Sequence, residues 1–570
     1  MIRNVKSRKK EVTEIKILSK KKNSMRIRAE LSSVLGLREG GFFEGCAEKL
    51  INLRVRGGAL CLRDGISEGP FLRDEIIFAQ SVVCGGSSIG FIADKNAMYA
   101  VYGHTTNEEP GEPVLFEGVD PENAFVFSTG NHVYLFSSGK FLIFNGAEFS
   151  DVSASLHEIT VKDNRITQSA LSEGVNLLTG KVKISFSPSE ETGELIFEEE
   201  IESAEDIIFD GEDISSSANI SSDKRRLIFS SPVSPSGLLT LTVTPKKYAA
   251  AENEDISLFC RASSETGECY VCDRERIYRI SSDSDGKLFL SSPIFESGRN
   301  SIRACFFCSG RLAAAVGGTI GLIENGKLTA IDSEGIRSKD SVCTGGAYAY
   351  LNTGEHVTRI SFSPSGSSYE VKCTTHDNSF AKREPMTPVC MTYSPFDRSL
   401  YSISVKAPYR SKPSLFSLDT QNGVWTEIEG ISSPKYCFSL DGSVAVTSGN
   451  RLYFIVDGQG GDRTKSESFP IEGRILTCRS DLSLPCERKR VLSASASLSG
   501  IIEDFTLTLS ADNGESDLFR YENPSYSANV SVFPVCRMNI GRFSFAMIEA
   551  RLRGYSGAAL HDVYIDLKRT

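Results

Sequence analysis

The sequence has few of the residues and motifs on which most enzymes and membrane proteins depend. It contains one tryptophan and six histidines in 570 residues, and it has no G-x-S-x-G, H-E-x-x-H or P-loop motif. The longest nearly apolar run, Leu312–Ile323, is far shorter than the ~20 residues of a membrane-spanning helix. Residues 1–10 also lack the apolar stretch of a signal peptide. We therefore expect a protein made in a cytoplasm, with no membrane anchor, no catalytic residues and no cofactor.

Cysteine is present in a pattern that does not favour disulfides. Fifteen cysteines, an odd number, are scattered through the chain, unlike the dense framework of a small secreted domain. Two C-x-x-C pairs, Cys269–Cys272 and Cys305–Cys308, would together supply four thiolates to a zinc ion. Both pairs stand in strand-like segments without a tight glycine turn, and strand positions i and i+3 point to opposite faces. We therefore predict buried free thiols and no metal site.

Charge is distributed unevenly along the chain. Residues 1–38 hold 12 lysines and arginines and three glutamates, a net charge of +9, whereas the other residues carry a net charge of −19. This asymmetry predicts a basic N-terminal arm on an acidic body. The arm is expected to bind an acidic partner or nucleic acid, and the alternative is a solvated tail.

One segment of the arm, 20–28, has the alternation of a strand. Met25 and Ile27 alternate with basic residues, so the segment is expected to pair as an added strand with a neighbouring subunit. Contact with phosphate is the alternative, and the lack of an aromatic residue argues against sequence-specific reading of bases. The candidate partner contacts of the arm are Lys20, Lys21, Lys22, Arg26 and Arg28.

A repeated hairpin unit dominates the middle of the chain. Segments such as 319–331 and 414–428 contain two short apolar strands joined by Asn-Gly, a strong signal for a tight turn. Another short strand precedes most of these segments, and four strands with a period of about 40 residues are typical of a β-propeller. A string of unrelated β-meanders is the alternative. The anchor residues of the units are Met98, Val133, Ile277, Ile320, Val357, Leu415 and Leu452.

The spacing of the anchors also predicts the domains. The long step from Val133 to Ile277 implies an insertion of roughly 100 residues, with a short helix within 164–178. Alternating segments near the C-terminus predict a small β-sandwich. The predicted fold is thus all-β, an about seven-bladed propeller with an inserted β-rich domain and a C-terminal β-sandwich-like domain. The predicted boundaries are 1–38 for the arm, 39–72 for a hairpin segment, 73–151 for blades 1–2, 152–255 for the inserted domain, 256–471 for blades 3–7 and 472–570 for the C-terminal domain.

An acidic stretch stands out within the inserted domain. Between Glu190 and Asp213 there are 12 acidic residues and no basic one. Several carboxylates are what a calcium ion requires, but no EF-hand spacing is present. We therefore expect a solvated acidic edge.

The hairpin segment carries two arginines that raise a functional question. Gly57-Gly58 predicts a two-residue turn that pairs Arg56 with Ala59 and Arg54 with Cys61. The opposite face is apolar, and because an isolated hairpin is marginal in water, it must pack on another element. We expect Arg54 and Arg56 to contact a neighbouring subunit or an adaptor. The alternative is a hairpin packed on the propeller with solvated arginines.

The segment 40–66, GGFFEGCAEKLINLRVRGGALCLRDGI, resembles the start of the nozzle or head-completion (DNA-stabilisation) proteins of short-tailed phages. Asn52-Leu53-Arg54, the following glycine turn and the second strand carry this resemblance. An insertion at about 152–255 and C-terminal strands within 539–569 also resemble that family. The basic arm is a departure from the family pattern.

The resemblance implies a structural virion protein of the phage tail. It implies a sixfold ring below the portal and adaptor that extends the tail tube, retains packaged DNA and conducts it on ejection without sequence-specific binding. An acidic body is compatible with this role, because it repels DNA phosphates. The rival hypotheses are a cytoplasmic propeller scaffold that binds a protein partner, and a propeller hydrolase or lyase.

Overall fold

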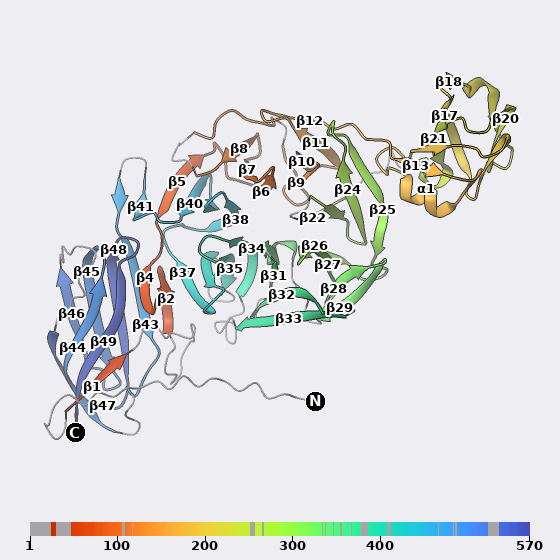
Figure 1. The fold of residues 1–570 in the computed structure, drawn as a ribbon. Helices are drawn as coiled ribbons and strands as arrows, with labels where there is room; N and C mark the ends of the chain where they lie inside the picture. The colour runs from red at the N-terminus through yellow and green to blue at the C-terminus, as the bar shows by residue number, and fades with distance from the viewer. Residues whose placement is uncertain are drawn as a thin grey trace.

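The computed structural model of the chain consists almost entirely of antiparallel β-sheets, which confirms the predicted all-β class (Figure 1). No helix among the described residues is long and apolar enough to cross a membrane. The structure describes residues 24–29 and 47–570, except for 105–108, 117, 251–256, 265–266, 333–334, 337, 346, 354–355, 366–367, 378–385, 407–411, 465–466, 483, 485–486 and 523–534.

Seven sheets follow one another around a ring within the described residues (Figure 1). The first three sheets contain β6 (Phe78–Cys84), β7 (Ser87–Ala93) and β8 (Met98–Tyr102); β9 (Phe125–Thr129), β10 (His132–Ser137), β11 (Lys140–Phe144) and β12 (Phe149–Asp151); and β22 (Cys260–Ser263), β23 (Cys269–Cys272), β24 (Arg276–Ser282) and β25 (Leu288–Glu296). The next two contain β26 (Ile302–Cys308), β27 (Arg311–Val316), β28 (Thr319–Glu324) and β29 (Lys327–Asp332); and β30 (Val342–Gly345), β31 (Tyr348–Asn352), β32 (His356–Ser365) and β33 (Ser368–Asp377). The last two contain β34 (Met386–Ser394), β35 (Ser399–Lys406), β36 (Ser414–Asp419) and β37 (Val424–Ile428); and β38 (Pro434–Leu440), β39 (Ser443–Ser448), β40 (Arg451–Val456) and β5 (Ile66–Phe71), followed by β41 (Asp462–Arg463) and β42 (Ser468–Phe469).

The innermost strands of these sheets form a closed cycle. Each contacts the next in the order β6, β9, β22, β26, β30, β34 and β38, and β38 contacts β6 again. This is the arrangement of a propeller, in which the sheets are the blades and apolar clusters fill the spaces between them. The anchor Val133 departs from the others, because it lies in the second strand of its blade whereas the other anchors lie in the third.

The start of the chain closes the ring. Strand β5 pairs antiparallel with β40, with Phe454 opposite Ser67, and supplies the fourth strand of the last blade. The prediction of one hairpin segment over 39–72 is therefore wrong at its C-terminal end, since residues 66–71 belong to the propeller. This strand supplies backbone hydrogen bonds that the otherwise open edge of β40 needs.

The inserted domain lies to one side of the ring and has its own core (Figure 1). One sheet contains β13 (Glu158–Val161), β15 (Val182–Phe186), β21 (Leu239–Pro245), β17 (Ile201–Phe209) and β18 (Glu212–Asp213); the other contains β14 (Arg165–Ile166), β16 (Thr192–Phe197), β20 (Arg226–Val233) and β19 (Ala218–Ile220). The helix α1 (Gln168–Gly174) lies inside the segment where a helix is predicted, and the Thr167 side chain caps its N-terminus. Buried Asn176 docks the domain on the third blade, because its Nδ2 donates to Leu288 O and its Oδ1 accepts from Leu290 N.

The C-terminal sandwich combines both ends of the chain. One sheet contains β3 (Leu53–Arg56), β4 (Ala59–Leu62), β49 (Ala559–Arg569), β44 (Lys489–Ser499) and β47 (Val535–Phe543), and β1 (Ser24–Ala29) pairs with β49. The other contains β2 (Ala47–Ile51), β43 (Ile471–Thr477), β48 (Ala546–Gly554), β45 (Ile502–Ala511) and β46 (Ser516–Glu522). Strand β2 also pairs with β37 of the sixth blade, so one nine-stranded sheet runs from the propeller into the sandwich.

Ring closure by β5 gives the first testable prediction. A Cβ atom at Gly69 would lie 2.4 Å from Phe454 Cε2, whereas a Cβ at Gly460 would meet nothing within 4 Å. Gly69→Ala is therefore expected to lower the free energy of unfolding by about 1–3 kcal/mol, because overpacking displaces the strand. Gly460→Ala is the matched control and should change it by less than about 0.5 kcal/mol. Urea unfolding followed by the fluorescence of buried Trp425 measures both, and equal effects would contradict the role of β5.

Candidate functional site

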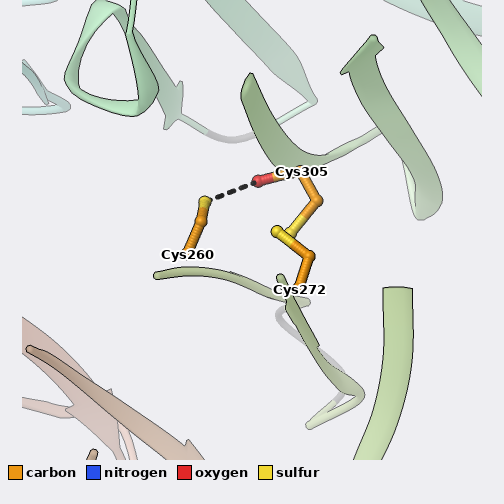
Figure 2. Close-up of side chains that lie close together, drawn as sticks. All are labelled: Cys260, Cys272 and Cys305. Carbon is orange, nitrogen blue, oxygen red and sulfur yellow. Dashed lines mark hydrogen bonds between the residues drawn. The ribbon is translucent and has the colours of Figure 1, made fainter. Parts of the chain in front are cut away.

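The four cysteines of the two C-x-x-C pairs do not come together at one site. Instead, one cysteine of each pair lies close to a third cysteine from elsewhere in the sequence (Figure 2). The Sγ atoms of Cys260, Cys272 and Cys305 all lie within 4.8 Å of one another, and the three side chains are buried. Cys260 and Cys272 are opposite each other on β22 and β23, and Cys305 comes from β26 of the next blade. We call these three residues the thiol cluster.

The other two cysteines of the pairs face different blades. Cys269 packs between the second and third blades, beside Ser263, and burial raises the pKa of its thiol to about 11. The Cys308 thiol approaches Ile360 O of the fifth blade at 3.1 Å. The alternation of strand side chains thus separates the members of each pair, as the sequence predicts. The described cysteines all carry free thiols.

The described part of the basic arm binds the chain itself. Strand β1 runs antiparallel to β49, with Ile27 opposite Ile565. Arg26 forms an ion pair with Asp566 at 3.0 Å, and Arg28 forms one with Asp562 at 2.8 Å. The predicted strand is therefore present, but its partner is the chain's own C-terminal strand and not a neighbouring subunit. Lys20, Lys21 and Lys22 lie outside the described residues.

The hairpin has the register that the sequence predicts. Arg54 pairs with Cys61 and Arg56 pairs with Ala59, with the turn at Gly57-Gly58. The apolar face packs in the sandwich, where Leu53 and Leu60 are buried. The alternative of a hairpin packed on the propeller with two solvated arginines is thus wrong for Arg54.

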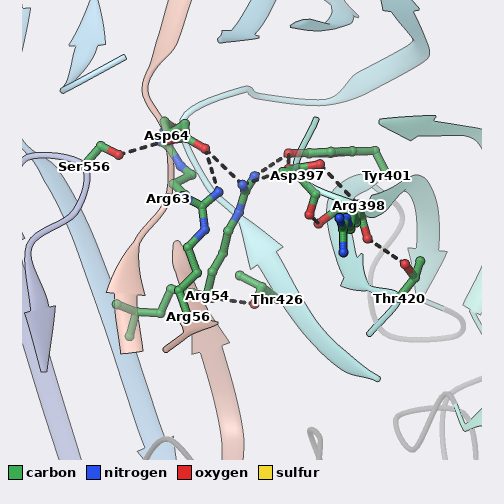
Figure 3. A network of polar contacts seen from close by, with 12 residues as sticks. Arg54, Arg56, Arg63, Asp64, Asp397, Arg398, Tyr401, Thr420, Thr426 and Ser556 are labelled. Carbon is green, nitrogen blue, oxygen red and sulfur yellow. Dashed lines mark hydrogen bonds and ion pairs between the residues drawn. The ribbon is translucent and has the colours of Figure 1, made fainter. Parts of the chain in front are cut away.

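Arg54 is buried in a network of charges within the chain (Figure 3). Its side chain is 8% exposed, and Nη1 lies 2.8 Å from Asp397 Oδ2 of the sixth blade and 3.1 Å from Asp64 Oδ2. Its Nη2 donates to the Tyr401 hydroxyl, which donates in turn to Asp397 at 2.7 Å. Burial acts to lower the pKa of Arg54, but its interactions with Tyr401, Asp397 and Asp64 raise the pKa by a larger amount, so the net shift is upward. The acidic surface that Arg54 contacts is therefore its own propeller, and the prediction of a partner contact is wrong for this residue.

Arg56 has a different environment from Arg54, two positions away. Its side chain is 50% exposed, and Nη2 reaches Asp64 Oδ2 at 3.3 Å. Asp64 also accepts from Ser556 Oγ of the sandwich at 3.0 Å. One buried carboxylate thus joins the hairpin to the Ser556 region of the sandwich, and Arg54 links it to Asp397 of the propeller. Arg56 keeps enough exposed surface for the predicted partner contact, which stays a prediction.

A second buried arginine completes this junction. Arg63 is 1% exposed and forms a bidentate pair with Asp462, at 2.8 and 2.9 Å. Its Nε donates to Asn52 Oδ1, and its remaining N–H groups reach backbone carbonyl oxygens. Asn52 adopts φ 53°, a left-handed conformation that asparagine tolerates, and donates through Nδ2 to Glu472 O of the sandwich. We call Asn52, Arg54, Arg63, Asp64, Asp397 and Asp462 the seam.

A cavity of about 400 Å³ opens beside the seam, where the hairpin meets the sixth blade. Arg54, Arg56, Asp397, Arg398, Asp419 and Asp457 are among its lining residues. Two of these lining residues, Arg54 and Asp397, form an ion pair with each other. Asp397 is therefore paired with a cation, and it does not present a free carboxylate to the cavity as a catalytic acid or base.

Three of the twelve acidic residues in the stretch 190–213 form ion pairs with lysines. Lys181 pairs with Glu205, Lys224 with Glu202 and Lys246 with Glu200, at 2.6–2.9 Å. A hydrogen bond from Lys246 lowers the pKa of Glu200. The paired glutamates are 39–49% exposed, as expected for a solvated acidic edge.

Reading the cysteines as C-x-x-C pairs misses Cys260, which stands alone in the sequence. A periodic signal was available, because five innermost strands in succession carry a cysteine two to four residues before they end. Their spacing follows the blade period. They are Cys260, Cys305, Cys343, Cys390 and Cys437.

Comparisons with known proteins add little to this description. No family model and no curated protein matches the sequence. Among solved structures, virginiamycin B lyase from Staphylococcus aureus is 10% identical and covers 68% of this chain and 98% of its own, with a TM-score of 0.36. PorZ, a surface component of the type-IX secretion system of Porphyromonas gingivalis, is 9% identical and covers 89% and 86%, with a TM-score of 0.22. An exo-beta-1,3-galactanase from Phanerochaete chrysosporium is 11% identical and covers 54% and 95%, with a TM-score of 0.22. Similarity this distant does not bear on what the chain does.

The contrast between the two hairpin arginines is testable. Arg54→Met leaves buried Asp397 without a cation and Asp64 with only Arg56, so we expect the free energy of unfolding to fall by about 3–5 kcal/mol. Arg56→Met is the matched control and should cost less than about 1 kcal/mol, because its ion pair is half-exposed. Urea unfolding of both variants measures this, and equal losses for the two variants would contradict the seam.

Proposed function

We propose that the chain is a structural subunit of the tail nozzle of a short-tailed phage or prophage. In this role six copies form a ring below the portal and adaptor, extend the tail tube, retain the packaged DNA and conduct it on ejection. The protein is then located in the virion tail after synthesis in the host cytoplasm. The observation that carries the proposal is the shared sheet and the buried ion pairs that join the propeller to a sandwich built from both chain ends.

This connection is what a tail subunit under load requires. A nine-stranded sheet crosses from the sixth blade into the sandwich, and the seam holds the same boundary with buried charge pairs. Linkers between independent domains are usually flexible and polar, whereas this boundary has a continuous core around Trp425. Such a block transmits force without bending and keeps its surfaces in fixed positions for ring contacts.

The charge distribution supports the same role. The chain outside residues 1–38 carries a net charge of −19, and an acidic wall lets DNA slide because it repels phosphates. The inserted domain projects from the third blade and offers a second surface for neighbours (Figure 1). A cytoplasmic scaffold would also use a rigid propeller, so the oligomeric state is the property that separates the two hypotheses.

The test is the mass of the full chain in solution, by light scattering with negative-stain images of the same sample, at low and moderate salt. We expect rings with sixfold symmetry and six times the mass of the 62.2 kDa chain, alone or after addition of a portal–adaptor complex from the same genome. A monomer in every mixture contradicts the nozzle role and favours the scaffold or the enzyme. The Gly460→Ala variant is expected to form the same rings, and it serves as a control for loss of assembly during handling.

A further inference from the structure

The thiol cluster has the composition and spacing of a site for a soft metal ion. Zinc bonds thiolate sulfur at about 2.3 Å, so tetrahedral geometry separates neighbouring sulfur atoms by about 3.8 Å. The three Sγ atoms already lie within 4.8 Å of one another without any ion. The three side chains come together from β22, β23 and β26 (Figure 2). Among the described residues this is the one group of three or more such ligands that close together.

The hydrogen bonding of the cluster does not account for three buried thiols in one place. The Cys260 thiol has two backbone oxygens nearby, Arg261 O at 3.6 Å and Cys305 O at 3.9 Å, and both contacts are long. Hydrogen bonds this long leave the three sulfur atoms available to a metal ion.

Two cations come from residues close to the cluster. Lys339 Nζ donates to Phe259 O, one residue before Cys260, at 2.8 Å. Arg261 follows Cys260 in the chain, and its Nη2 donates to Ser81 O at 2.8 Å. Neither forms an ion pair with a carboxylate in the described part of the chain. Positive charge held close by is what a buried anionic site requires.

We propose that Cys260, Cys272 and Cys305 bind one zinc ion that ties the third blade to the fourth. Zn²⁺ replaces three thiol protons, which leave to solvent, and the resulting zinc–trithiolate carries one negative charge opposite Arg261 and Lys339. The site is structural, because it lies inside the apolar cluster between two blades. It reverses the expectation of no metal, which considered the two C-x-x-C pairs alone. The proposal is independent of the tail function.

The experiment measures zinc in the full chain after expression in zinc-supplemented medium and gel filtration. Inductively coupled plasma mass spectrometry is expected to give about one zinc per chain, and about 0.1 or less in Cys260→Ser, Cys272→Ser and Cys305→Ser. The matched controls are Cys269→Ser and Cys308→Ser, which remove buried thiols from the same strands but outside the cluster. They should keep about one zinc per chain.

A second measurement keeps the test valid if a cluster variant folds poorly. Alkylation of the wild-type thiols without reductant, followed by mass spectrometry, distinguishes a zinc site from a disulfide between Cys272 and Cys305. Protection of the three cluster thiols that is lost on adding a chelator supports the proposal. Wild-type protein without zinc, a disulfide in this cluster, or equal zinc in the cluster variants and the controls would overturn it.

Discussion

The structure depends on two buried arginines that hold the propeller against the sandwich. A buried charge is tolerated only when its partners remain in place, because desolvation costs several kcal/mol per ion. Arg54 bonds Asp397 of the sixth blade, and Arg63 bonds Asp462 next to the last blade. Both arginines belong to the short N-terminal hairpin region. Separation of the propeller from the sandwich would therefore leave charged groups without partners on both sides. Apolar packing around Trp425 fills the same boundary and gives the charges their low-dielectric surroundings.

Because of the path of the chain, formation of this boundary completes the fold. The N-terminal segment supplies β2 to the sheet that joins the two parts, β3 and β4 to the sandwich, and β5 to the last blade. These strands pair with residues hundreds of positions later, so the ring and the sandwich can be completed only when the whole chain is present. Such non-local contacts slow folding, and once formed they leave few exposed strand edges. The inserted domain is an exception, because its core is local to residues 158–248.

Local features of the sequence were sufficient to predict the hairpins but not the segments that pack against them. The Gly57-Gly58 turn fixed the register of β3 and β4, because turn geometry and alternation are local properties. The partner of Arg54 was not predictable, since Tyr401 is 347 residues away and several acidic segments were equally plausible. The strand at Met25–Arg28 was recognised, but whether its partner is the same chain or another is not encoded in its alternation. Cys260 was missed because the two cysteines close to it in space, Cys272 and Cys305, lie on β23 and on β26 of the next blade.

The central claim is that the propeller and the sandwich behave as one rigid unit. Hydrogen exchange followed by mass spectrometry across a urea series tests it most directly, because it reports the opening of each strand separately. The account predicts that β37 of the propeller and β43 of the sandwich lose protection at the same urea concentration, since β2 pairs with both. Separate midpoints for these two strands, with the sandwich opening while the blades stay protected, would contradict it.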